Sequence, residues 1–285
     1  MKLDNMQVVV LENKRVIGSY FKMRLSYDGV LNALPGQFIM MKVNNSYDPL
    51  LSRPMSFHRI ISPNPSLEKG GRGKFEILYQ VVGKGTGIMS GLKEGDKIDI
   101  LGPLGRGFLI PDWMDRAIII AGGMGVAPMM ALTEEISRHE VKKSKISISV
   151  FMGVKTKDDI LCREDFERIG AEVYVSTEDG SLGKKGTCVD LLKELMTNTP
   201  LFSPPSEGGG CGGAIFACGP QGMLKAIAGI AMDKKILCQV SLDKRMACGT
   251  GACLGCVIKV KSQKYACVCK EGPVFDAGEI NWEML

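Results

Sequence analysis

The sequence predicts an α+β protein of several domains: an antiparallel β-barrel, a doubly wound α/β domain and a small C-terminal segment rich in cysteine. Short strand-like segments between glycine, proline and asparagine residues fill the first 110 positions, and strands then alternate with helices up to residue 236. Five of the ten cysteines follow residue 247. A chain of 285 residues has room for about two full domains and one small one. We place the three units at residues 1–110, 111–236 and 237–285.

Composition excludes several classes of protein. Hydrophobic residues make up 45% of the chain and charged residues 24%, which are ordinary values for a globular protein. No apolar run approaches the roughly 20 residues that cross a bilayer, and the N-terminal segment lacks the apolar stretch of a secretory signal. We therefore expect a cytoplasmic protein that does not contact a membrane. The net charge of +5 is not gathered into a basic block, so nucleic acid is not an expected partner.

The first 110 residues carry the pattern of a small antiparallel barrel. The expected strands are short and separated by turn residues: 7–11, 38–43, 75–82 and 97–101. No long amphipathic helix is expected among them. Residues 62–74 hold two prolines and three glycines, and we expect them to form an exposed hairpin loop.

From residue 116 the pattern changes to alternating strands and helices, which predicts a parallel sheet with helices on both faces. The expected strands are 117–121, 146–152, 172–176 and 214–217, and the expected helices are 128–140, 158–169, 189–196 and 221–232. Residues 197–213 are rich in proline, glycine and serine, and we expect them to be a loop inserted between a helix and a strand.

The strongest functional signal is the spacing Cys248-x4-Cys253-x2-Cys256, which is typical of the plant-type [2Fe–2S] loop. Glycines between the cysteines let the backbone turn so that its N–H groups can face the sulfur atoms. A fourth ligand is expected from the hairpin that follows. There, Cys267 and Cys269 lie two apart on one expected strand, so they share a face and periodicity does not choose between them. Zinc is the alternative metal, although zinc sites usually pair two C-x2-C units.

Two weaker motifs in the barrel half predict a flavin dinucleotide site. Residues 53–56 read Arg-Pro-Met-Ser, and residues 83–86 read Gly-Lys-Gly-Thr. Each motif alone can be an ordinary surface turn. Together they favour FAD binding, because an arginine can form two hydrogen bonds with a pyrophosphate and glycines allow the backbone to approach the same charge.

Two glycine-containing turns in the second half predict a nucleotide site at the carboxyl edge of the parallel sheet. The first, Gly-Gly-Met-Gly-Val-Ala-Pro at 122–128, links a strand to a helix, where backbone N–H groups and the helix dipole favour a phosphate. This motif differs from the Rossmann fingerprint because Pro128 replaces the third glycine. The alternative to a phosphate site is a strand-to-helix turn that binds no ligand. The second turn, Cys-Gly-Pro at 218–220, is expected to bring Cys218 to the ligand; a buried structural thiol is the alternative.

Other polar residues give weaker signals. Glu178 and Asp179 follow an expected strand. A carboxylate at such a place can accept a hydrogen bond from a ribose hydroxyl and repels a 2′-phosphate, so the pair favours NAD over NADP. The alternative is that both residues belong to a solvated turn. His58 and His139 have no partner in a recognisable catalytic relay, and we predict that both are non-catalytic. No catalytic acid, base or nucleophile is assigned. No role is assigned to Cys162, Cys188, Cys211 and Cys238, which are scattered along the chain.

Taken in order, these motifs resemble those of the ferredoxin-NADP reductase superfamily over nearly the whole chain, with a flavin barrel followed by a nicotinamide domain. The tail, including Cys-Lys-Glu-Gly-Pro-Val-Phe at 269–275, resembles more specifically the electron-transfer subunits of dihydroorotate dehydrogenase B. This resemblance implies that Cys269 is the fourth ligand beside Cys248, Cys253 and Cys256. It implies FAD contacts from Arg53, Pro54, Met55, Ser56, Leu78, Tyr79, Gln80, Gly85 and Thr86, with Met55 where the wider superfamily commonly has an aromatic residue. Expected NAD contacts are Gly122, Gly123, Gly125, Pro128, Cys218, Gly219 and Pro220, with Cys218 near the nicotinamide.

The resemblance implies an oxidoreductase subunit that relays electrons. Nicotinamide exchanges two electrons as a hydride and an iron–sulfur cluster passes one at a time, so a flavin must stand between them. The implied route runs from the FMN of a separate catalytic subunit, through [2Fe–2S] and FAD, to NAD+, in pyrimidine (UMP) biosynthesis and in a heterotetramer with two of each subunit. The similar small subunit of NADH-dependent ferredoxin:NADP oxidoreductase, which typically carries Asp at the position of Cys248, is one alternative. A stand-alone flavin reductase and a zinc-stabilised binding module are the others.

Overall fold

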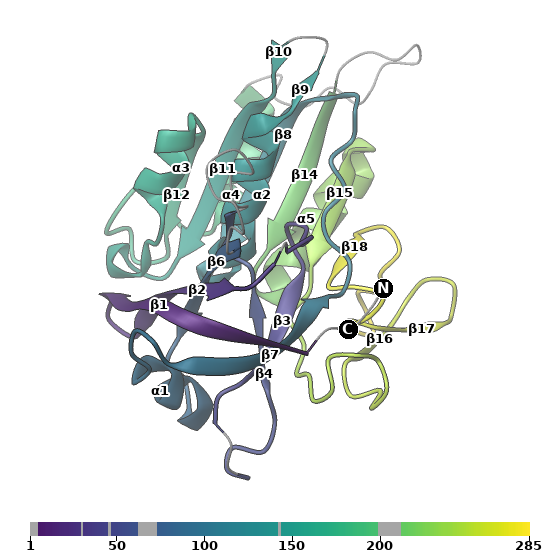
Figure 1. Cartoon of the computed structure of the whole chain (residues 1–285). Coiled ribbons are helices and arrows are strands. Elements are labelled where there is room, and N and C mark those ends of the chain that lie inside the picture. The colour runs from purple at the N-terminus through teal and green to yellow at the C-terminus, as the bar shows by residue number, and fades with distance from the viewer. Residues whose placement is uncertain (1–4, 30, 45–46, 62–72, 142–143, 199–211) are drawn as a thin grey trace.

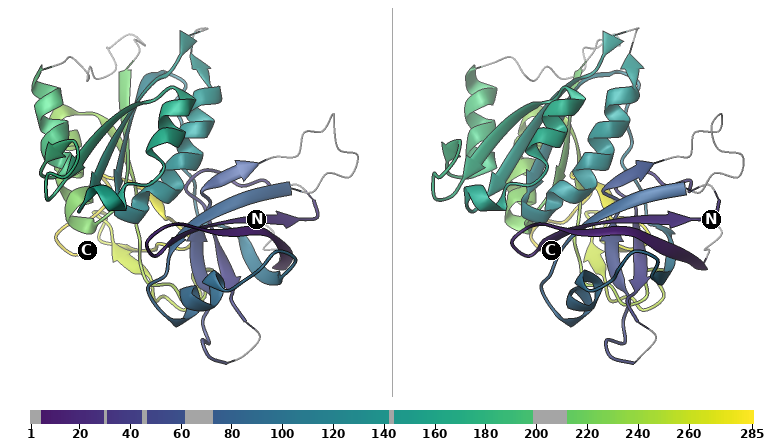
Figure 2. Two further views of the ribbon diagram at one scale, coloured as in Figure 1. Left: turned by 90° about the vertical axis from the view of Figure 1, so that its left-hand side faces the viewer. Right: turned by 60° about the vertical axis from the view of Figure 1, so that its left-hand side comes forward.

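The computed structural model of the protein describes residues 5–29, 31–44, 47–61, 73–141, 144–198 and 212–285. Two seven-stranded sheets form most of it (Figure 1). Figure 2 shows the N-terminal sheet, in purple and blue, below the second sheet and its helices, in teal and green. The C-terminal segment, in yellow, lies against both. This arrangement of a barrel-like antiparallel sheet, an α/β sheet and a C-terminal segment confirms the predicted fold class.

The N-terminal sheet is antiparallel throughout and has the strand order β4-β3-β7-β1-β2-β6-β5. Its strands are β1 (Asn5–Ile17), β2 (Tyr20–Tyr27), β3 (Phe38–Lys42), β4 (Arg53–Ser56), β5 (Arg59–Ile61), β6 (Gly73–Gln80) and β7 (Lys97–Leu104). Buried and partly exposed residues alternate along β2, so Phe21, Met23 and Leu25 all face the interior of the sheet. The prediction missed β2 and underestimated the length of β1.

One short helix in the N-terminal half was not predicted. α1 (Lys84–Ser90) begins inside the Gly-Lys-Gly-Thr motif, where a turn was expected. The Thr86 hydroxyl accepts hydrogen bonds from the backbone N–H groups of Val82 and Gly83 at 3.0 and 3.2 Å, which stabilises the start of the helix. Two glycines in seven residues hide this helix from propensity arguments. Most of the expected loop at 62–74 lies outside the described residues, and β6 begins at Gly73.

The second sheet has the strand order β13-β12-β11-β8-β14-β15-β18, and all its pairs are parallel except that of β15 with β18. Its strands are β8 (Met114–Gly122), β11 (Ser147–Val154), β12 (Glu172–Thr177), β13 (Lys184–Lys185), β14 (Gly212–Cys218), β15 (Leu237–Ser241) and β18 (Val274–Asp276). A separate pair, β9 (Glu140–Val141) and β10 (Ser144–Lys145), follows the first helix of this domain.

Helices cover both faces of this sheet, as a doubly wound fold requires. They are α2 (Val126–Arg138), α3 (Arg163–Ile169), α4 (Cys188–Asn198) and α5 (Gln221–Lys234). Ile118 and Ile120 of β8 belong to the core under α4 and α5, whereas Ala117 and Ile119 belong to the core under α2 and α3. No helix among the described residues is both long and apolar enough to cross a membrane.

The helix expected at 158–169 is the clearest error of prediction in this domain. A short 3-10 turn, Lys157–Asp159, comes first, and α3 begins only at Arg163. The Asp159 carboxylate accepts hydrogen bonds from the backbone N–H and hydroxyl of Thr156, which closes the first turn locally. Cys162 has a left-handed backbone (φ 63°), so no continuous helix can pass through it. In the inserted loop expected at 197–213, residues 199–211, with Cys211, lie outside the described part of the chain.

The C-terminal segment is built into the second sheet and lies against the N-terminal one. β15 and β18 are strands of the parallel sheet, and between them β16 (Val257–Lys259) and β17 (Tyr265–Cys267) form a hairpin. On the barrel side, Gly249 has φ 73°, and a Cβ there would lie 2.5 Å from the Met40 side chain and 3.1 Å from Leu104. Glycine therefore allows the cysteine-bearing loop to lie directly on the N-terminal sheet.

Candidate functional site

The cysteine loop surrounds its sulfur atoms with backbone N–H donors. Each predicted ligand sulfur accepts at least one: Thr250 N–H and Cys253 N–H donate to Cys248 Sγ at 3.4 Å, Gly255 N–H to Cys253 Sγ at 3.4 Å, Cys269 N–H to Cys256 Sγ at 3.4 Å, and Gly251 N–H to Cys269 Sγ at 3.1 Å. Such donors stabilise negative charge on sulfur and are a known means of tuning iron–sulfur clusters.

The structure separates Cys267 from Cys269. The expectation that both lie on one face of a strand is wrong, because β17 ends at Cys267 and the chain then turns, with Lys270 N–H and Glu271 N–H both donating to the Cys267 carbonyl. The Cys269 sulfur accepts from the Gly251 amide, whereas the Cys267 thiol lies 3.9 Å from the Gly251 carbonyl oxygen. A carbonyl oxygen repels a thiolate, so the surroundings of Cys269 suit a ligand and those of Cys267 suit a neutral thiol.

The acidities of the cysteines differ because their surroundings differ. Burial opposes ionisation of Cys248, but the backbone N–H groups of Cys253 and Thr250 outweigh it and lower the pKa of Cys248 to about 6. Burial, reinforced by the neighbouring Cys256 side chain, raises the pKa of Cys269 to about 12. Cys248 therefore ionises readily without further help, and a positively charged metal is what would hold Cys269 as a thiolate.

The four cysteines supply the donor set that a [2Fe–2S] cluster uses. Such a cluster spreads four thiolates over two irons, and each of these four sulfurs accepts a hydrogen bond from a backbone N–H group. A structural zinc would instead need all of its ligands at about 2.0–2.3 Å from one point.

A cavity of about 850 Å³ lies where the two sheets face each other. From the barrel side it is lined by seven of the nine residues predicted to contact FAD: Pro54, Met55, Ser56, Leu78, Tyr79, Gln80 and Thr86. From the other side it is lined by all seven residues predicted to contact NAD: Gly122, Gly123, Gly125, Pro128, Cys218, Gly219 and Pro220. The two predicted half-sites therefore form one cavity, at the carboxyl edge of the parallel sheet where ligands of α/β proteins bind.

Arg53 and Gly85, the two remaining predicted FAD residues, lie against each other beside the cavity lining. A Cβ at Gly85 would be 2.4 Å from Arg53 Nε, so only glycine at this position allows the arginine side chain to rest on α1. The Arg53 guanidinium also donates to the Leu51 carbonyl. The side chain of Arg53, the first residue of β4, is thus held against α1 beside the cavity.

At the carboxyl edge of the parallel sheet, the turns that follow β8 and β14 meet through their backbones. A Cβ at Gly125 would lie 2.0 Å from the Cys218 carbonyl oxygen, and one at Gly219 would lie 2.9 Å from the Gly122 Cα. The two predicted turns therefore pack directly on each other. Burial raises the pKa of the Cys218 thiol to about 12, so this side chain of the cavity wall stays neutral.

Only one of the two predicted acidic residues lines the cavity. Glu178 does, together with Lys155, whereas the Asp179 carboxylate accepts hydrogen bonds from the Ser181 N–H and hydroxyl at 2.9 and 2.6 Å. These hydrogen bonds hold the pKa of Asp179 below its ordinary value. Asp179 therefore caps a local turn, and of the two acidic residues only Glu178 keeps the predicted place beside a bound nucleotide.

Four residues of the segment 241–246 also line the cavity, and no motif predicted them: Ser241, Leu242, Asp243 and Met246. Ser241 ends β15, and Asp243 and Met246 follow it directly. Cys248, the first cysteine of the loop, comes two residues after Met246. This part of the cavity wall thus runs directly into the cysteine loop.

Comparison with known proteins agrees with this geometry. Residues 119–229 match a family model described as an oxidoreductase NAD-binding domain, and residues 243–281 match one described as the iron-sulfur cluster binding domain of dihydroorotate dehydrogenase B. A solved structure of an NADH-dependent reduced ferredoxin-NADP oxidoreductase superposes with a TM-score of 0.76 at 26% identity, covering 96% of this chain and 90% of the other. The fold and the site thus define an oxidoreductase of the ferredoxin-NADP reductase type.

Curated relatives specify the family. The dihydroorotate dehydrogenase B (NAD(+)) electron transfer subunit of Desulforamulus reducens is 38% identical over 256 residues, covering 88% of each chain. That of Caldanaerobacter subterraneus subsp. tengcongensis is 37% identical over 278 residues, covering 96% of this chain and 98% of its own. The chain belongs to the family of dihydroorotate dehydrogenase B electron transfer subunits.

The first prediction concerns the fourth cluster ligand. Replacing Cys269 by serine (Cys269→Ser) should abolish or strongly alter the EPR signal of the reduced cluster, because it removes the sulfur that accepts from Gly251 N–H. The matched control is Cys267→Ser, two residues away, which should leave the signal nearly intact. The reverse pattern in the two spectra would falsify the assignment.

The second prediction is that Arg53→Ala weakens FAD retention. The change removes a charge-assisted hydrogen bond to pyrophosphate of about 1.5–3 kcal/mol, or roughly ten- to a hundredfold in affinity. Titration of FAD into apoprotein measures this loss. Arg15→Ala, at an exposed arginine of β1 outside the cavity lining, is the control. An FAD affinity equal to that of the unmodified protein would mean that Arg53 is only a surface residue.

The third prediction is that NADH reduces the bound flavin much faster than NADPH, because Glu178 repels a 2′-phosphate. Glu178→Gln should narrow the difference by about tenfold, and Asp179→Asn, which alters a residue turned toward Ser181, should not. Stopped-flow measurement of flavin bleaching with both nucleotides checks the expectation. Equal rates, or a preference for NADPH in the unmodified protein, would refute it.

Proposed function

We propose that this chain is the electron-transfer subunit of an NAD-dependent dihydroorotate dehydrogenase, and that it relays electrons between a partner subunit and NAD+ through [2Fe–2S] and FAD. The observation that carries the proposal is the continuity of the cavity wall with the cysteine loop, because Met246 lines the cavity and Cys248 follows two residues later. A chain that passes electrons between two centres has to hold them close together, and this segment meets that need.

The proposed cofactor contacts follow the two walls of the cavity. FAD is assigned to Arg53 and to the barrel-side residues that line the cavity, with Gly85 making room for the arginine. NAD is assigned to the turns at 122–128 and 218–220, and the cluster to Cys248, Cys253, Cys256 and Cys269. When bound, FAD exchanges a hydride with nicotinamide and single electrons with the cluster, which makes the chain a two-to-one electron converter.

The protein residues bind and orient these groups rather than react themselves. Arg53 supplies positive charge for a pyrophosphate, and the backbone of the two glycine turns allows close approach of a second nucleotide. The N–H groups around the cysteines stabilise the negative charge of the thiolates. No residue of the chain is assigned as a proton-abstracting base, so the oxidation of dihydroorotate belongs to the partner.

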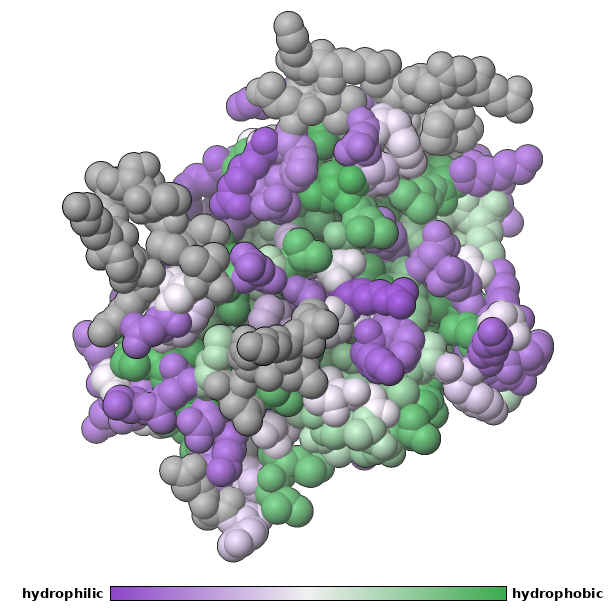
Figure 3. Space-filling view, turned by 45° about the vertical axis from the view of Figure 1, so that its right-hand side comes forward, coloured by the Kyte–Doolittle hydropathy of each residue, from purple (hydrophilic) through white to green (hydrophobic). Residues whose placement is uncertain are grey.

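The proposed partner is an FMN-containing catalytic dihydroorotate dehydrogenase subunit, in a heterotetramer with two of each chain. Figure 3, in which the right-hand side of Figure 1 comes forward, shows hydrophobic side chains among hydrophilic ones at the surface. On the cysteine loop and the hairpin that follows it, Leu254 and Tyr265 are 63% and 69% exposed. Exposed apolar side chains on this segment favour docking of a protein partner close to the cluster.

The physiological direction that we propose runs from dihydroorotate to NAD+. In that direction the four cysteines would hold the cluster that accepts electrons from the FMN of the partner, and the cavity would hold FAD and NAD+, the final acceptor. This reaction serves the synthesis of pyrimidine nucleotides, and we place it in the cytoplasm.

A second candidate is the small subunit of an NADH-dependent ferredoxin-NADP oxidoreductase. The structural similarity to that enzyme at 26% identity is the observation that favours it. Curated dihydroorotate dehydrogenase B relatives are 37–38% identical over 88–96% of the chain, which favours the first function. The two candidates share a fold and differ in the partner that the cluster serves.

The fourth prediction tests this function by reconstitution. The chain alone should oxidise NADH with artificial acceptors. It should not oxidise dihydroorotate, because we propose no residue of this chain as the base that removes a proton from that substrate. Mixing it with its cognate FMN-containing subunit should create dihydroorotate-dependent NAD+ reduction that neither subunit shows alone. Dihydroorotate oxidation by this chain alone, or no gain on mixing, would overturn the proposal.

A further inference from the structure

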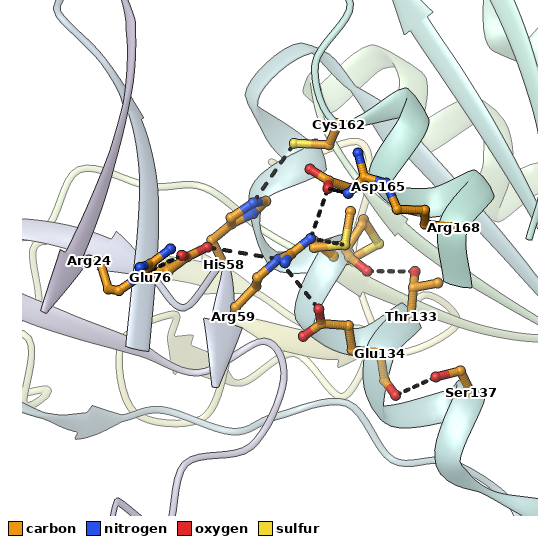
Figure 4. Close-up of polar contacts among 12 residues, drawn as sticks. Arg24, His58, Arg59, Glu76, Thr133, Glu134, Ser137, Cys162, Asp165 and Arg168 are labelled. Carbon is orange, nitrogen blue, oxygen red and sulfur yellow. Dashed lines mark hydrogen bonds and ion pairs between the residues drawn. The ribbon is translucent and has the colours of Figure 1, made fainter. Parts of the chain in front are cut away.

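A cluster of buried polar side chains joins the two halves of the protein on the side of α2 and α3 (Figure 4). His58 and Arg59 come from the N-terminal sheet, directly after the 53–56 strand that lines the cofactor cavity. Their partners lie on α2 and at or near the start of α3, helices of the nucleotide domain. The cluster therefore couples the flavin side of the cavity to the nucleotide side.

His58 makes the first part of this joint. It is fully buried, its Nδ1 lies 3.1 Å from the Ala127 carbonyl oxygen, and its Nε2 lies 3.8 Å from Cys162 Sγ. A carbonyl oxygen only accepts, so Nδ1 carries the proton and Nε2 accepts from the Cys162 thiol. Ala127 also lines the cavity, so this histidine holds the start of α2 at the point where the nucleotide turn ends.

Arg59 makes the second part of this joint through ion pairs with three carboxylates. Its Nη2 lies 3.1 Å from Asp165 of α3, and its Nε lies 3.3 Å from Glu134 of α2 and 3.8 Å from Glu76 of β6. Glu76 is 3% exposed and is also paired with Arg24 at 2.9 Å. The barrel thus binds one side of the guanidinium, and two helices of the nucleotide domain, α2 and α3, bind the other.

These ion pairs depend more on charge than on directed hydrogen bonds. Arg59 Nε and Glu76 Oε2 are buried and make no hydrogen bond, although each lies within ion-pair distance of an opposite charge. Partly buried charge pairs are screened less than exposed ones, so the attraction across the joint is substantial. A lysine at position 59 would keep the positive charge but would lose the planar set of N–H donors of the guanidinium.

We propose that Arg59 is a positioning residue for hydride exchange: by joining Glu76 to Glu134 and Asp165, it sets the distance between the flavin wall and the nucleotide wall of the cavity. The inference rests on the proposed function, because it concerns the geometry of that cavity. Arg59 does not line the cavity itself, and it acts through β4, which leads to it, and through α2, which follows the 122–125 turn. A misplacement of about 1 Å between reacting groups can cost roughly a hundredfold in rate.

The test uses the complete protein with FAD and cluster bound, and compares Arg59→Met, Arg59→Lys and the control Arg163→Met. Arg163 pairs with Glu167 inside α3 and is exposed, so its loss leaves the joint intact. Stopped-flow reduction of the flavin by NADH gives the limiting rate and the half-saturating concentration, and hydrogen exchange reports the protection of α2 and α3. NADH loses a hydride to become NAD+ in this reaction, and the flavin gains it.

Arg59→Met should lower the limiting rate about tenfold or more, change the half-saturating NADH concentration by less than about threefold, and weaken the protection of α2 and α3. FAD and cluster content should stay at the level of the unmodified protein, Arg59→Lys should restore part of the rate, and Arg163→Met should match the unmodified protein. An unchanged limiting rate in Arg59→Met would overturn the inference, as would a loss of rate that only follows a loss of FAD. Failure of the unmodified protein to accept electrons from NADH would instead refute the proposed function.

Discussion

The cofactor cavity depends on one constraint, which is the direct backbone contact between the turns that end β8 and β14. Gly125 has no room for a side chain against the Cys218 carbonyl, and Gly219 has none against Gly122. Because the two strands pair in parallel, their carboxyl ends meet at the same edge of the sheet. Any side chain between these turns would push them apart or fill the space that a nucleotide needs, so the glycines fix this wall of the cavity.

The C-terminal segment depends on the same edge. It is too small to fold on its own hydrophobic core, and it is held by β15 and β18 in the parallel sheet and by Gly249 on the barrel. Its cysteine loop therefore lies where the two sheets meet, directly after the residues that line the cavity. Bound metal would add further stability, because four thiols that are close together in the folded chain favour the folded state when they become ligands.

Sequence reasoning succeeded where local pattern determines structure. The parallel strands were predictable because β8 and β14 are buried on both faces and read as continuous apolar runs, and the cysteine loop was predictable from its spacing. β2 was missed because Lys22 and Arg24 occupy its outward positions, and α1 because it contains two glycines. Periodicity could not separate Cys267 from Cys269, because residues two apart share a face of a strand. The structure separates them because β17 ends at Cys267 and the chain then turns. The joint at Arg59 was beyond prediction because its partners are distant in sequence.

Three buried groups near the two walls, one imidazole and two thiols, are kept neutral, which suits a chain whose cofactors change charge as they work. Burial lowers the pKa of His58 to about 4, so its imidazole is neutral above that pH, and burial raises the pKa values of Cys162 and Cys218 to about 12, so both thiols are neutral below it. The charges that line the cavity are instead those of Lys155, Asp159, Glu178 and Asp243. Between about pH 4 and 12 these three buried groups therefore stay neutral, so they add no charge to the cavity wall. The charges that can act on a bound nucleotide therefore lie in the cavity lining, whereas the ion pairs of Arg59 lie outside it, between the domains.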